Sequence, residues 1–585
     1  MRRLLDYIGR YRLRYAFGIL CTFATATLAM IIPLLVRDTI NAVQAGHPDR
    51  IAHFAMLIAG AAVLMGTSRW FSRFIIFNCG RDIEYDLRAD LFAHLDRLDP
   101  YFYERLRTGD LMSRLINDLS NVRMMVGMGV LTFANTPLYY GYALLFMTSL
   151  NHRLTAASII PYVILFGVIK WLTQRLMERS LAVQEGLGEI GAKVQESLAG
   201  IHVVKAYTLE DHDASGFRAL NDRYNEQALK LASVRGALMP LIRGAAAAST
   251  MVVLIYGGYM VTQKLISIGD LVAFMGYLGQ LAWPTTALGW MISIYQRGRA
   301  SMRRLEQIFD EPTSFAIDGE GTRLEVAGAV EWDHVSFSYA ARDSRFAGLN
   351  GDAPYALRNI SVKVAPGQKL AIVGRTGSGK STMVRLLTRL IEPTAGRVML
   401  DGRDIRDLAP TALRRTIGLV PQEPTLFSDS VARNIAFGRS DAPFDEIRDA
   451  ARIAGLEGDI AAMPRGLETI VGERGMALSG GQKQRVTIAR LLVYDPAVVV
   501  LDDALASVDT ETERTVLGSL GENVRGRTTI VVSHRASTVR DADQIIVLDS
   551  GEIAERGTHE ELMAQRGIYA ELFHRQLLEE ELASY

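Results

Sequence analysis

The sequence is poor in cysteine and has no excess of charge of either sign. Its 585 residues include only two cysteines, Cys21 and Cys79. Two cysteines cannot form a disulfide framework, and these two lack the spacing of a metal site. The 64 basic and 64 acidic side chains give a formal net charge of zero, which argues against nucleic acid as the main partner. The length indicates more than one domain.

Charge is also missing from long stretches of the N-terminal half. Five runs carry no charged residue at all, and a sixth is apolar apart from His53: 15–36, 51–68, 124–150, 154–169, 244–263 and 271–296. A helix needs about 20 mainly apolar residues to cross a bilayer. The 154–169 run is short but can extend through Lys170 and Trp171, which suit the interface. We predict six transmembrane helices; six buried helices of a soluble protein are the disfavoured alternative.

Basic residues in the flanks of these runs predict the orientation in the membrane. Five arginines lie within the first 14 residues, so the N-terminus is expected in the cytoplasm. The first segment suits either an interfacial amphipathic helix or a simple basic flank. The long, charged stretches 78–123 and 171–235 are expected to be cytoplasmic helical extensions. The first run is too long for a cleaved signal peptide, and Pro33 and Arg37 follow where small residues would be needed.

The pattern changes after about residue 300, where short β-branched runs alternate with helical stretches. Examples of such runs are 369–373, 498–501 and 529–532. This alternation predicts an α/β domain with a substantially parallel sheet. The expected organisation is a cytoplasmic interfacial segment over 1–14, a transmembrane domain over 15–300, a linker over 301–325 and a nucleotide-binding domain over 326–585.

The strongest motif is GRTGSGKS, which runs from Gly374 to Ser381. It follows the apolar strand 370–373 and precedes a helical pattern over 382–390, as a phosphate-binding loop does. Glycines allow backbone N–H groups to surround phosphates, and Lys380 neutralises their charge. Residues expected to contact ATP are Gly374, Arg375, Thr376, Gly377, Ser378, Gly379, Lys380, Ser381 and Thr382. The Ser381 hydroxyl and Asp502, which ends the strand 498–502, are expected to bind Mg²⁺.

The stretch 478–485 reads LSGGQKQR and stands ahead of the Asp502 strand. It resembles the signature of ATP-binding cassette (ABC) exporters of the half-transporter type. The resemblance implies a Q-loop residue at Gln422 that also assists Mg²⁺, a switch histidine at His534, an adenine-stacking aromatic at Tyr339 and a D-loop aspartate at Asp509. Residues 100–118 and 196–207 resemble the intracellular loops of the same family, so the likeness covers essentially the whole chain.

The resemblance also implies a partner. In this family two cassettes close head to tail around two ATP molecules, and each signature completes the site of the other cassette. Here those signature groups are Ser479, Gly480, Gly481 and Gln482. One chain with six membrane helices and one cassette therefore needs a second half-transporter. ATP binding would switch the cavity from inward-facing to outward-facing. The family implies a multi-pass protein of a bacterial cytoplasmic membrane, with its cassette in the cytoplasm.

One position departs from the family pattern. Glutamate usually follows the Walker B aspartate and orients or deprotonates the attacking water, whereas this chain has Asp503. Its carboxylate is one methylene shorter, which predicts a slow or non-hydrolysing site. An intact signature beside an impaired site resembles the degenerate-site subunit of heterodimeric multidrug or lipid exporters. The alternatives are a homodimer and neutral drift that retains a carboxylate.

Polar and aromatic residues in or beside the membrane runs are candidates for substrate contact. They are Arg69, Arg73, Arg243, Gln280, Trp283, Trp290 and Tyr295. The expected function is ATP-driven export of amphipathic small molecules in a lipid bilayer. Two alternatives remain: a lipid flippase, which shares every motif, and a mainly regulatory subunit that binds ATP but hydrolyses little, which Asp503 keeps open. An importer is disfavoured because the helices and the cassette are fused.

Overall fold

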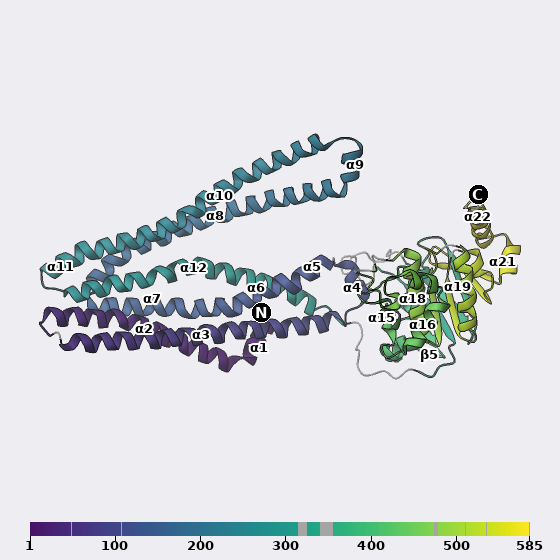
Figure 1. The fold of residues 1–585 in the computed structure, drawn as a ribbon, viewed down its shortest axis with the longest axis horizontal. Coiled ribbons are helices and arrows are strands. Elements are labelled where there is room, and N and C mark those ends of the chain that lie inside the picture. The colour runs from purple at the N-terminus through teal and green to yellow at the C-terminus, as the bar shows by residue number, and fades with distance from the viewer. Residues whose placement is uncertain are drawn as a thin grey trace. The chain divides into compact units, whose positions relative to one another are not determined.

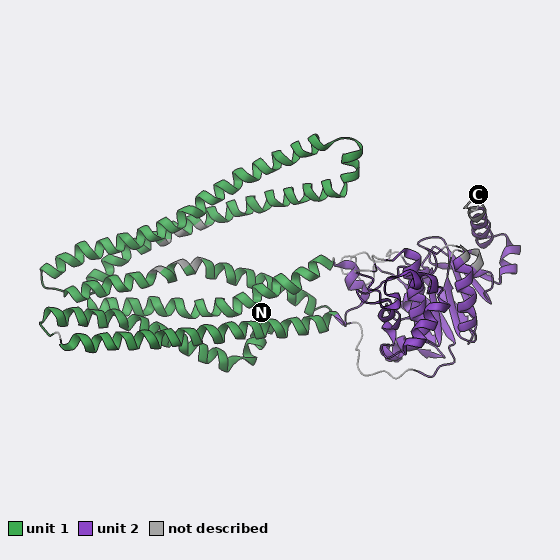
Figure 2. Cartoon of the chain, in the orientation of Figure 1, with its two compact units in different colours: residues 1–95, 108–311 green, residues 96–107, 312–585 purple. Residues whose placement is uncertain are grey.

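The computed structural model describes residues 1–47, 49–106, 108–313, 324–339, 355–472, 475, 478–508, 510–533 and 535–583. The chain divides into two compact units, shown in different colours in Figure 2. Unit 1 comprises residues 1–95 and 108–311, and unit 2 comprises residues 96–107 and 312–585. Unit 2 therefore includes residues 96–107, which in the sequence come between two helices of unit 1.

Unit 1 is helical throughout its regular structure (Figure 1). Its helices are α1 (Arg2–Arg10), α2 (Arg12–Gln44), α3 (Asp49–Leu95), α5 (Thr108–Ser113), α6 (Leu119–Met124), α7 (Val130–Leu150), α8 (His152–Ala199), α9 (Ile201–Ala206), α10 (Glu210–Val252), α11 (Gly258–Thr262) and α12 (Ile268–Phe309). Three π-helical turns continue neighbouring helices: η1 (Arg114–Asp118), η2 (Met125–Gly129) and η3 (Val253–Gly257). The six charge-poor runs are almost entirely helical.

Four helical segments of the described chain are long and apolar enough to cross a membrane: 12–44, 49–95, 152–199 and 210–262. The other two predicted runs form η2–α7 and α12, which carry more polar and aromatic side chains. Asn135 and Tyr139 lie on α7, and Gln280 and Pro284 lie on α12. Such residues are tolerated in a membrane where they face the interior of a helix bundle.

Four long helices of unit 1 share a common interior. The helices α2 and α3 pack along each other, and α7 and α12 pack beside them. Phe274 and Tyr277 of α12 are fully buried next to Met30 and Met147. The Tyr277 hydroxyl donates to the Met30 carbonyl oxygen over 3.0 Å. This bond satisfies a polar tip that would otherwise be unpaired in an apolar interior.

The remaining long helices, α8 and α10, pack against each other. They diverge from α7 and α12 toward α9 (Figure 1). Most side chains on the part of this pair nearest α9 are exposed in the single chain. Their burial must therefore come from something other than the rest of unit 1.

The N-terminal segment forms a helix, and hydrogen bonds hold it and the start of α2 to α3. Leu4 and Tyr7 are buried. The Tyr7 hydroxyl donates to Asp90, and the Tyr11 hydroxyl donates to Asp86 over 3.1 Å. Arg14 donates to Asp82 over 2.7 Å. The three aspartates are four residues apart, which places them on one face of α3.

Unit 2 is built on two sheets. A four-stranded antiparallel sheet has the order β2-β1-β4-β5, and a six-stranded sheet has the order β10-β9-β3-β8-β7-β6. All neighbours in the larger sheet pair in parallel except β10, which confirms the predicted α/β character. The strands are β1 (Val330–Phe337), β2 (Leu357–Val364), β3 (Lys369–Gly374), β4 (Ala395–Leu400), β5 (Arg403–Asp404), β6 (Ile417–Val420), β7 (Val498–Asp502), β8 (Thr528–Val532), β9 (Gln544–Asp549) and β10 (Glu552–Gly557).

Helices surround these sheets. They are α4 (Pro100–Arg105), α13 (Lys380–Leu387), α14 (Pro410–Thr416), α15 (Val431–Ile435), α16 (Phe444–Ile453), α17 (Glu457–Ala462), α18 (Gly480–Tyr494), α19 (Thr510–Asn523), α20 (Ala536–Val539), α21 (His559–Gln565) and α22 (Ile568–Ala583). Short 3₁₀ turns follow β5, α15 and α17: η6 (Ile405–Asp407), η7 (Ala436–Gly438) and η8 (Gly466–Glu468). The helix predicted over 382–390 begins two residues earlier and ends three earlier, because Arg389 has a left-handed φ of 49°.

The helix α4 comes from the predicted intracellular loop but belongs to unit 2. The Asp99 side chain caps it by accepting from the Phe102 backbone N–H over 3.0 Å. Phe102 is buried, and Arg385 of α13 donates to Glu104 over 3.0 Å. This piece of the membrane domain is thereby held on the sheet-containing unit.

Candidate nucleotide site and membrane cavity

The phosphate-binding loop joins the buried strand β3 to α13. Gly374 and Gly379 have φ values of 152° and 102°, a region that side chains rarely adopt. A Cβ on Gly379 would lie 2.5 Å from the Ala356 carbonyl oxygen, and one on Gly374 would lie 2.2 Å from that of Leu548. Both positions therefore require glycine, as the motif predicts.

The lysine and serine that end the motif lie at the start of α13. Lys380 donates to the carbonyl oxygens of Gly374 and Arg375 over 2.8 and 2.9 Å. Burial lowers the pKa of Lys380, while the carboxylates of Asp503 and Asp502 act in the opposite direction. The ammonium group is thus held inside the loop, where it can meet phosphate oxygens.

The residues predicted to bind Mg²⁺ supply hard oxygen donors. The Ser381 hydroxyl donates to Asp502 Oδ1 over 3.2 Å, and burial raises the pKa of Asp502. The described residues contain no group of three His, Cys, Asp or Glu side chains that could hold a metal. One hydroxyl and one carboxylate suit Mg²⁺, which takes few protein ligands and completes its shell with phosphates and water. When bound, the ion would neutralise phosphate charge.

A cavity of about 920 Å³ lies over the loop. It brings together residues far apart in sequence, including Tyr339, Gln422, Asp502 and Asp503. The predicted loop residues that line it are Gly374, Arg375, Thr376, Gly377, Gly379, Lys380, Ser381 and Thr382. Ser378 is the exception, because its side chain is buried behind the loop with a 4% exposed surface.

Tyr339 lies at the rim of this cavity. Its hydroxyl group shares a 3.1 Å hydrogen bond with Thr382 Oγ1, and its ring packs edge-on against Phe337 with centroids 4.8 Å apart. These contacts orient the ring at the edge of the site, where the resemblance implies stacking on adenine.

Asp503 follows β7 directly and also lines the cavity. Its backbone N–H donates to the Val532 carbonyl oxygen over 2.8 Å, and its φ is 50°. Aspartate tolerates this left-handed backbone better than most residues do. The side chain at this position therefore starts from a fixed backbone, and its length decides how far its carboxylate reaches.

The signature lies at the start of α18. Ser479 and Gln482 form a capping box: Ser479 Oγ accepts from the Gln482 backbone N–H over 3.3 Å, and Gln482 Oε1 accepts from the Ser479 backbone N–H over 2.9 Å. Gly480 and Gly481 lie close to Ser507. None of these four signature residues lines the cavity over the chain's own loop.

Comparisons with known proteins identify the family of both parts of the chain. The family model described as the ABC transporter transmembrane region matches residues 15–285, and the one described as ABC transporter matches residues 357–506. The chain belongs to the ABC transporter family. Family membership makes it an integral membrane protein with a helical transmembrane domain and an α/β ATPase domain that binds ATP.

Relatives and a solved structure match this ABC transporter over nearly its whole length. The chain is 35% identical over 583 residues to the "Probable multidrug resistance ABC transporter ATP-binding/permease protein YheI" of Bacillus subtilis, which covers 99% of the chain and 98% of the relative. It is 33% identical to an ATP-dependent lipid A-core flippase of Methylococcus capsulatus, covering 98% and 94%. A bacterial Atm1-family ABC exporter with ATP bound has a TM-score of 0.77 at 30% identity, covering 97% and 98%.

Two further predicted residues, Asp509 and His534, lie outside the described residues. The chain beside them is held by Arg535, which donates to the carbonyl oxygens of Ala506 and Val508 over 3.0 and 3.2 Å. Arg535 also pairs with Glu513, which is 1% exposed. A buried ion pair thus links the segment after β7 to the segment after β8.

Changing Glu513 to Gln is expected to lower the free energy of unfolding of unit 2 by about 2 kcal/mol, because Arg535 would lose its buried counter-charge. Thermal unfolding of the purified transporter would measure this loss. The matched control is Glu522→Gln, which changes the charge at an exposed position of the same helix and should leave the unfolding temperature unchanged. Equal unfolding temperatures for the two variants would contradict the role of this pair.

The structure adds residues to the ATP site that motif reading missed. Leu572, Arg575 and Gln576 of α22 line the cavity over the loop. They belong to no motif and follow the loop by about 200 residues. The only sequence signal was their spacing, which places them on one face of a helix.

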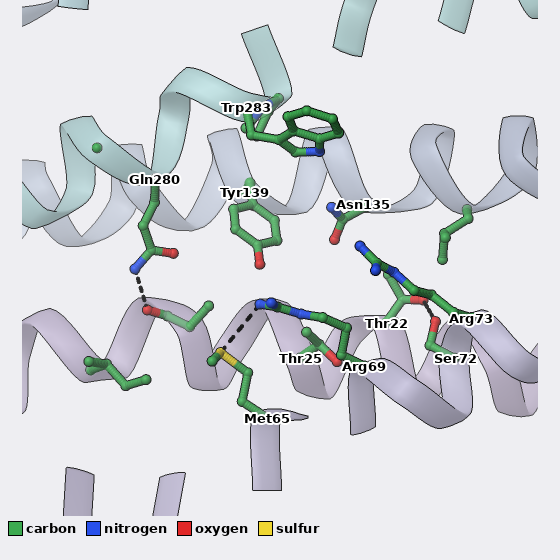
Figure 3. Close-up of a pocket in the computed structure, with 15 residues that line it drawn as sticks. Thr22, Thr25, Met65, Arg69, Ser72, Arg73, Asn135, Tyr139, Gln280 and Trp283 are labelled. Carbon is green, nitrogen blue, oxygen red and sulfur yellow. Dashed lines mark hydrogen bonds between the residues drawn. The ribbon is translucent and has the colours of Figure 1, made fainter. Parts of the chain in front are cut away.

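A second cavity, of about 460 Å³, lies within unit 1 between α2, α3, α7 and α12 (Figure 3). Arg69, Arg73, Gln280 and Trp283 line it, as predicted for substrate contact. The other three candidates, Arg243, Trp290 and Tyr295, are not among its lining residues. The added lining residues include Asn135 and Tyr139 of α7, which gives this cavity a mixed polar and aromatic wall.

Hydrogen bonds order part of this wall. Gln280 Nε2 donates to the Ala29 carbonyl oxygen over 2.6 Å, and Thr22 and Ser72 are joined by a 2.5 Å hydrogen bond. Arg69 donates to the Met65 sulfur over 3.6 Å. Figure 3 shows the Arg69 and Arg73 guanidinium groups on the same side of the cavity, facing α7.

Proposed function

We propose that this chain is one subunit of a heterodimeric ABC exporter of amphipathic small molecules, and that its own ATP site hydrolyses slowly. The observation that carries this proposal is Asp503. By the family resemblance it stands at the position that orients the attacking water, in a site that also contains Lys380, Ser381 and Asp502. The cassette is expected in the cytoplasm of a bacterial cell, with the helices in the cytoplasmic membrane.

The length of the Asp503 side chain supports slow hydrolysis. Relative to glutamate, its carboxylate falls short by about one C–C bond, roughly 1 Å or more. A misplacement of that size can cost on the order of 100-fold in rate. Binding of ATP depends on the loop, the lysine and the Mg²⁺ ligands, so it is expected to persist.

The signature supports the heterodimer. Its capping box and glycines present backbone N–H groups at the start of α18, an arrangement that stabilises negative charge. None of these groups lines the cavity over the chain's own loop, which supports their assignment to the site of a second cassette. A partner with a glutamate in the Asp503 position would then hold the fast site, completed by Ser479, Gly480 and Gly481 of this chain.

Exposed apolar side chains support the need for a second chain. Leu181, Leu187, Leu198, Val203 and Tyr207 of the α8–α10 extension are each more than half exposed. This stretch is expected to lie in the cytoplasm, where lipid cannot cover it. A second half-transporter would bury these residues, at about 25 cal/mol per Å² of apolar surface removed from water.

The position of α4 suggests how ATP drives transport. A cavity of about 460 Å³ within unit 2 is lined by Tyr101 and Glu104 of α4 together with Gln422 and Asp502. Closure of the cassettes around ATP would therefore act beside α4, and the chain on either side of α4 leads directly into α3 and α5. The binding energy of ATP for the closed state would thus be transmitted to the membrane helices.

ATPase measurements on purified protein test the proposal. The chain alone is expected to show little turnover, and the chain with its partner half-transporter is expected to show robust turnover. Removing the partner's catalytic glutamate should abolish activity. Robust, dimer-dependent activity from the chain alone would contradict the heterodimer. Nucleotide binding without activation of any partner would favour a regulatory subunit instead.

A lipid flippase is the second candidate, and the two arginines in the membrane cavity favour it. Arg69 and Arg73 offer two positive charges to an anionic headgroup. A relative whose name is lipid A-core flippase matches nearly the whole chain. The two functions differ in whether transport prefers an acidic lipid or a drug-like amphiphile.

The double change of Arg69 and Arg73 to Gln is expected to weaken binding of an anionic amphiphile about tenfold, because two charge-assisted contacts are lost. A cationic amphiphile should bind as before or more tightly. Substrate-stimulated ATPase and transport into inverted vesicles would measure both. Changing Arg243 to Gln serves as the control, since Arg243 does not line this cavity. Equal losses for both amphiphiles would contradict charge selection by these arginines.

A further inference from the structure

The C-terminal helix α22 is fixed to the sheet beside the phosphate-binding loop. Glu555 of β10 caps it by accepting from the backbone N–H groups of Ile568 and Tyr569 over 2.5 and 3.0 Å. Tyr569 is 1% exposed, and its hydroxyl group shares a 2.8 Å hydrogen bond with His559. Tyr569 packs in a cluster with Ala371 and Val373 of β3. The start of α22 is therefore part of the folded core, and its direction is set.

Because of this direction, one face of α22 lies along the ATP site. Leu572, Arg575 and Gln576 are spaced three and four residues apart, so they share a face, and all three line the cavity over the loop. One turn before Arg575, Glu571 lies 3.7 Å from Arg375 of the loop. Two separate observations thus place α22 against the loop.

The charged groups that line the cavity suggest that Arg575 helps to bind phosphate. The motif brings two cations to the cavity, Arg375 and Lys380, while Asp502 and Asp503 contribute two carboxylates. A triphosphate brings several more negative charges. A guanidinium group matches phosphate oxygens with two parallel N–H donors and keeps its charge at any physiological pH.

We infer that Arg575 binds the phosphates of the nucleotide held by this chain's own loop, with α22 as a wall of the site. This inference rests on the proposed nucleotide binding at the loop and adds a residue outside every motif. In a site that is proposed to hydrolyse ATP slowly, this contact would let α22 help the site to retain ATP.

Equilibrium binding of Mg·ATP to the purified full-length transporter tests the inference, with the partner's loop lysine changed so that only this site binds. Arg575→Gln is expected to raise the Kd about tenfold, and Arg575→Lys to recover part of that loss. The slope of log Kd against log salt should become shallower in Arg575→Gln, because one ionic contact is gone. A purely structural role would not change that slope.

Two controls separate contact from damage to the helix. His574→Gln alters an exposed side chain in the same turn of α22, and Arg566→Gln removes a cation; neither residue lines the cavity. Both changes should leave the Kd unchanged. An unchanged Kd in Arg575→Gln, or an equal rise in Arg575→Gln and His574→Gln, would overturn the inference. Lys380→Ala must weaken binding whatever Arg575 does; if it does not, the proposed nucleotide site itself fails.

Discussion

Replacing Asp503 with Glu is expected to raise ATP turnover at this chain's own site about 100-fold, because the longer side chain would bring a carboxylate to the attacking water. In the described part of the site, the groups predicted to hold phosphate and Mg²⁺ are already in place. Lys380 and Ser381 line the cavity with Asp502, and the backbone at residue 503 is held by its hydrogen bond to Val532. Turnover should be measured in the assembled pair with the partner's catalytic glutamate removed, so that any gain belongs to this site.

The matched control is Asp503→Asn, which removes the charge but keeps the size and tolerates the left-handed backbone at φ 50°. In the otherwise unchanged pair it should alter turnover by less than about twofold, since the partner's site would carry hydrolysis. A large loss in Asp503→Asn would contradict the proposal, because it would show that the short carboxylate already acts in catalysis. Gln422 offers a further check, as its removal should diminish the gain in Asp503→Glu.

Changing Gly481 to Asp is expected to lower turnover of the pair by about 100-fold to 1000-fold, the usual cost of losing preorganised donors at a developing charge. A carboxylate at this helix start would oppose the γ-phosphate of the partner's ATP. A Cβ on Gly481 would also lie 3.0 Å from the Ser507 carbonyl oxygen, so the segment after β7 would have to shift slightly. ATPase activity of the purified pair measures the effect.

The control for this change is Gly458→Asp in α17, where a Cβ meets nothing within 4 Å. It adds the same charge near the start of a neighbouring helix and should leave turnover unchanged. The turnover of Gly481→Asp compared with that of Asp503→Asn tests the proposal most directly. Two changes in one cassette should differ by at least about 50-fold, because the signature is proposed to serve the partner's site and Asp503 the chain's own. Similar losses from both would indicate two equivalent sites.

Much of the fold could be predicted because its signals are local. A charge-poor run must be helical in lipid, since each backbone group has to be satisfied within its own segment. Short β-branched runs that alternate with helices indicate a parallel sheet, because each run and each helix has its own local sequence pattern. The strands β3, β7 and β8 lie where these runs predicted them. The end of α13 was harder to predict from the sequence, because the left-handed backbone at Arg389 accompanies side-chain contacts with Glu392 and with the Leu408 carbonyl oxygen.

The residues of the ATP site also differ in how well the sequence predicts them. The loop between Gly374 and Ser381 could be predicted because its residues are consecutive and each has a separate chemical role. Asp502 was predicted from the strand that it ends, and Tyr339 and Gln422 through the family resemblance; the structure brings all three to the same cavity. The place of Arg575 in the site could not be predicted from the sequence. It depends on the capping of α22 by Glu555, a contact between a strand and a helix that has no sequence motif.

By itself, the sequence determined that this protein is a membrane-spanning half-transporter with one cassette, and that Asp503 stands where a longer carboxylate is usual. These conclusions depend on which residues are present and on their order. Only the tertiary structure decided that α4 belongs to unit 2, that Arg69 and Arg73 line a cavity whereas Arg243 does not, and that α22 forms a wall of the ATP site. Those outcomes depend on packing between distant segments, which neither local periodicity nor motif spacing records.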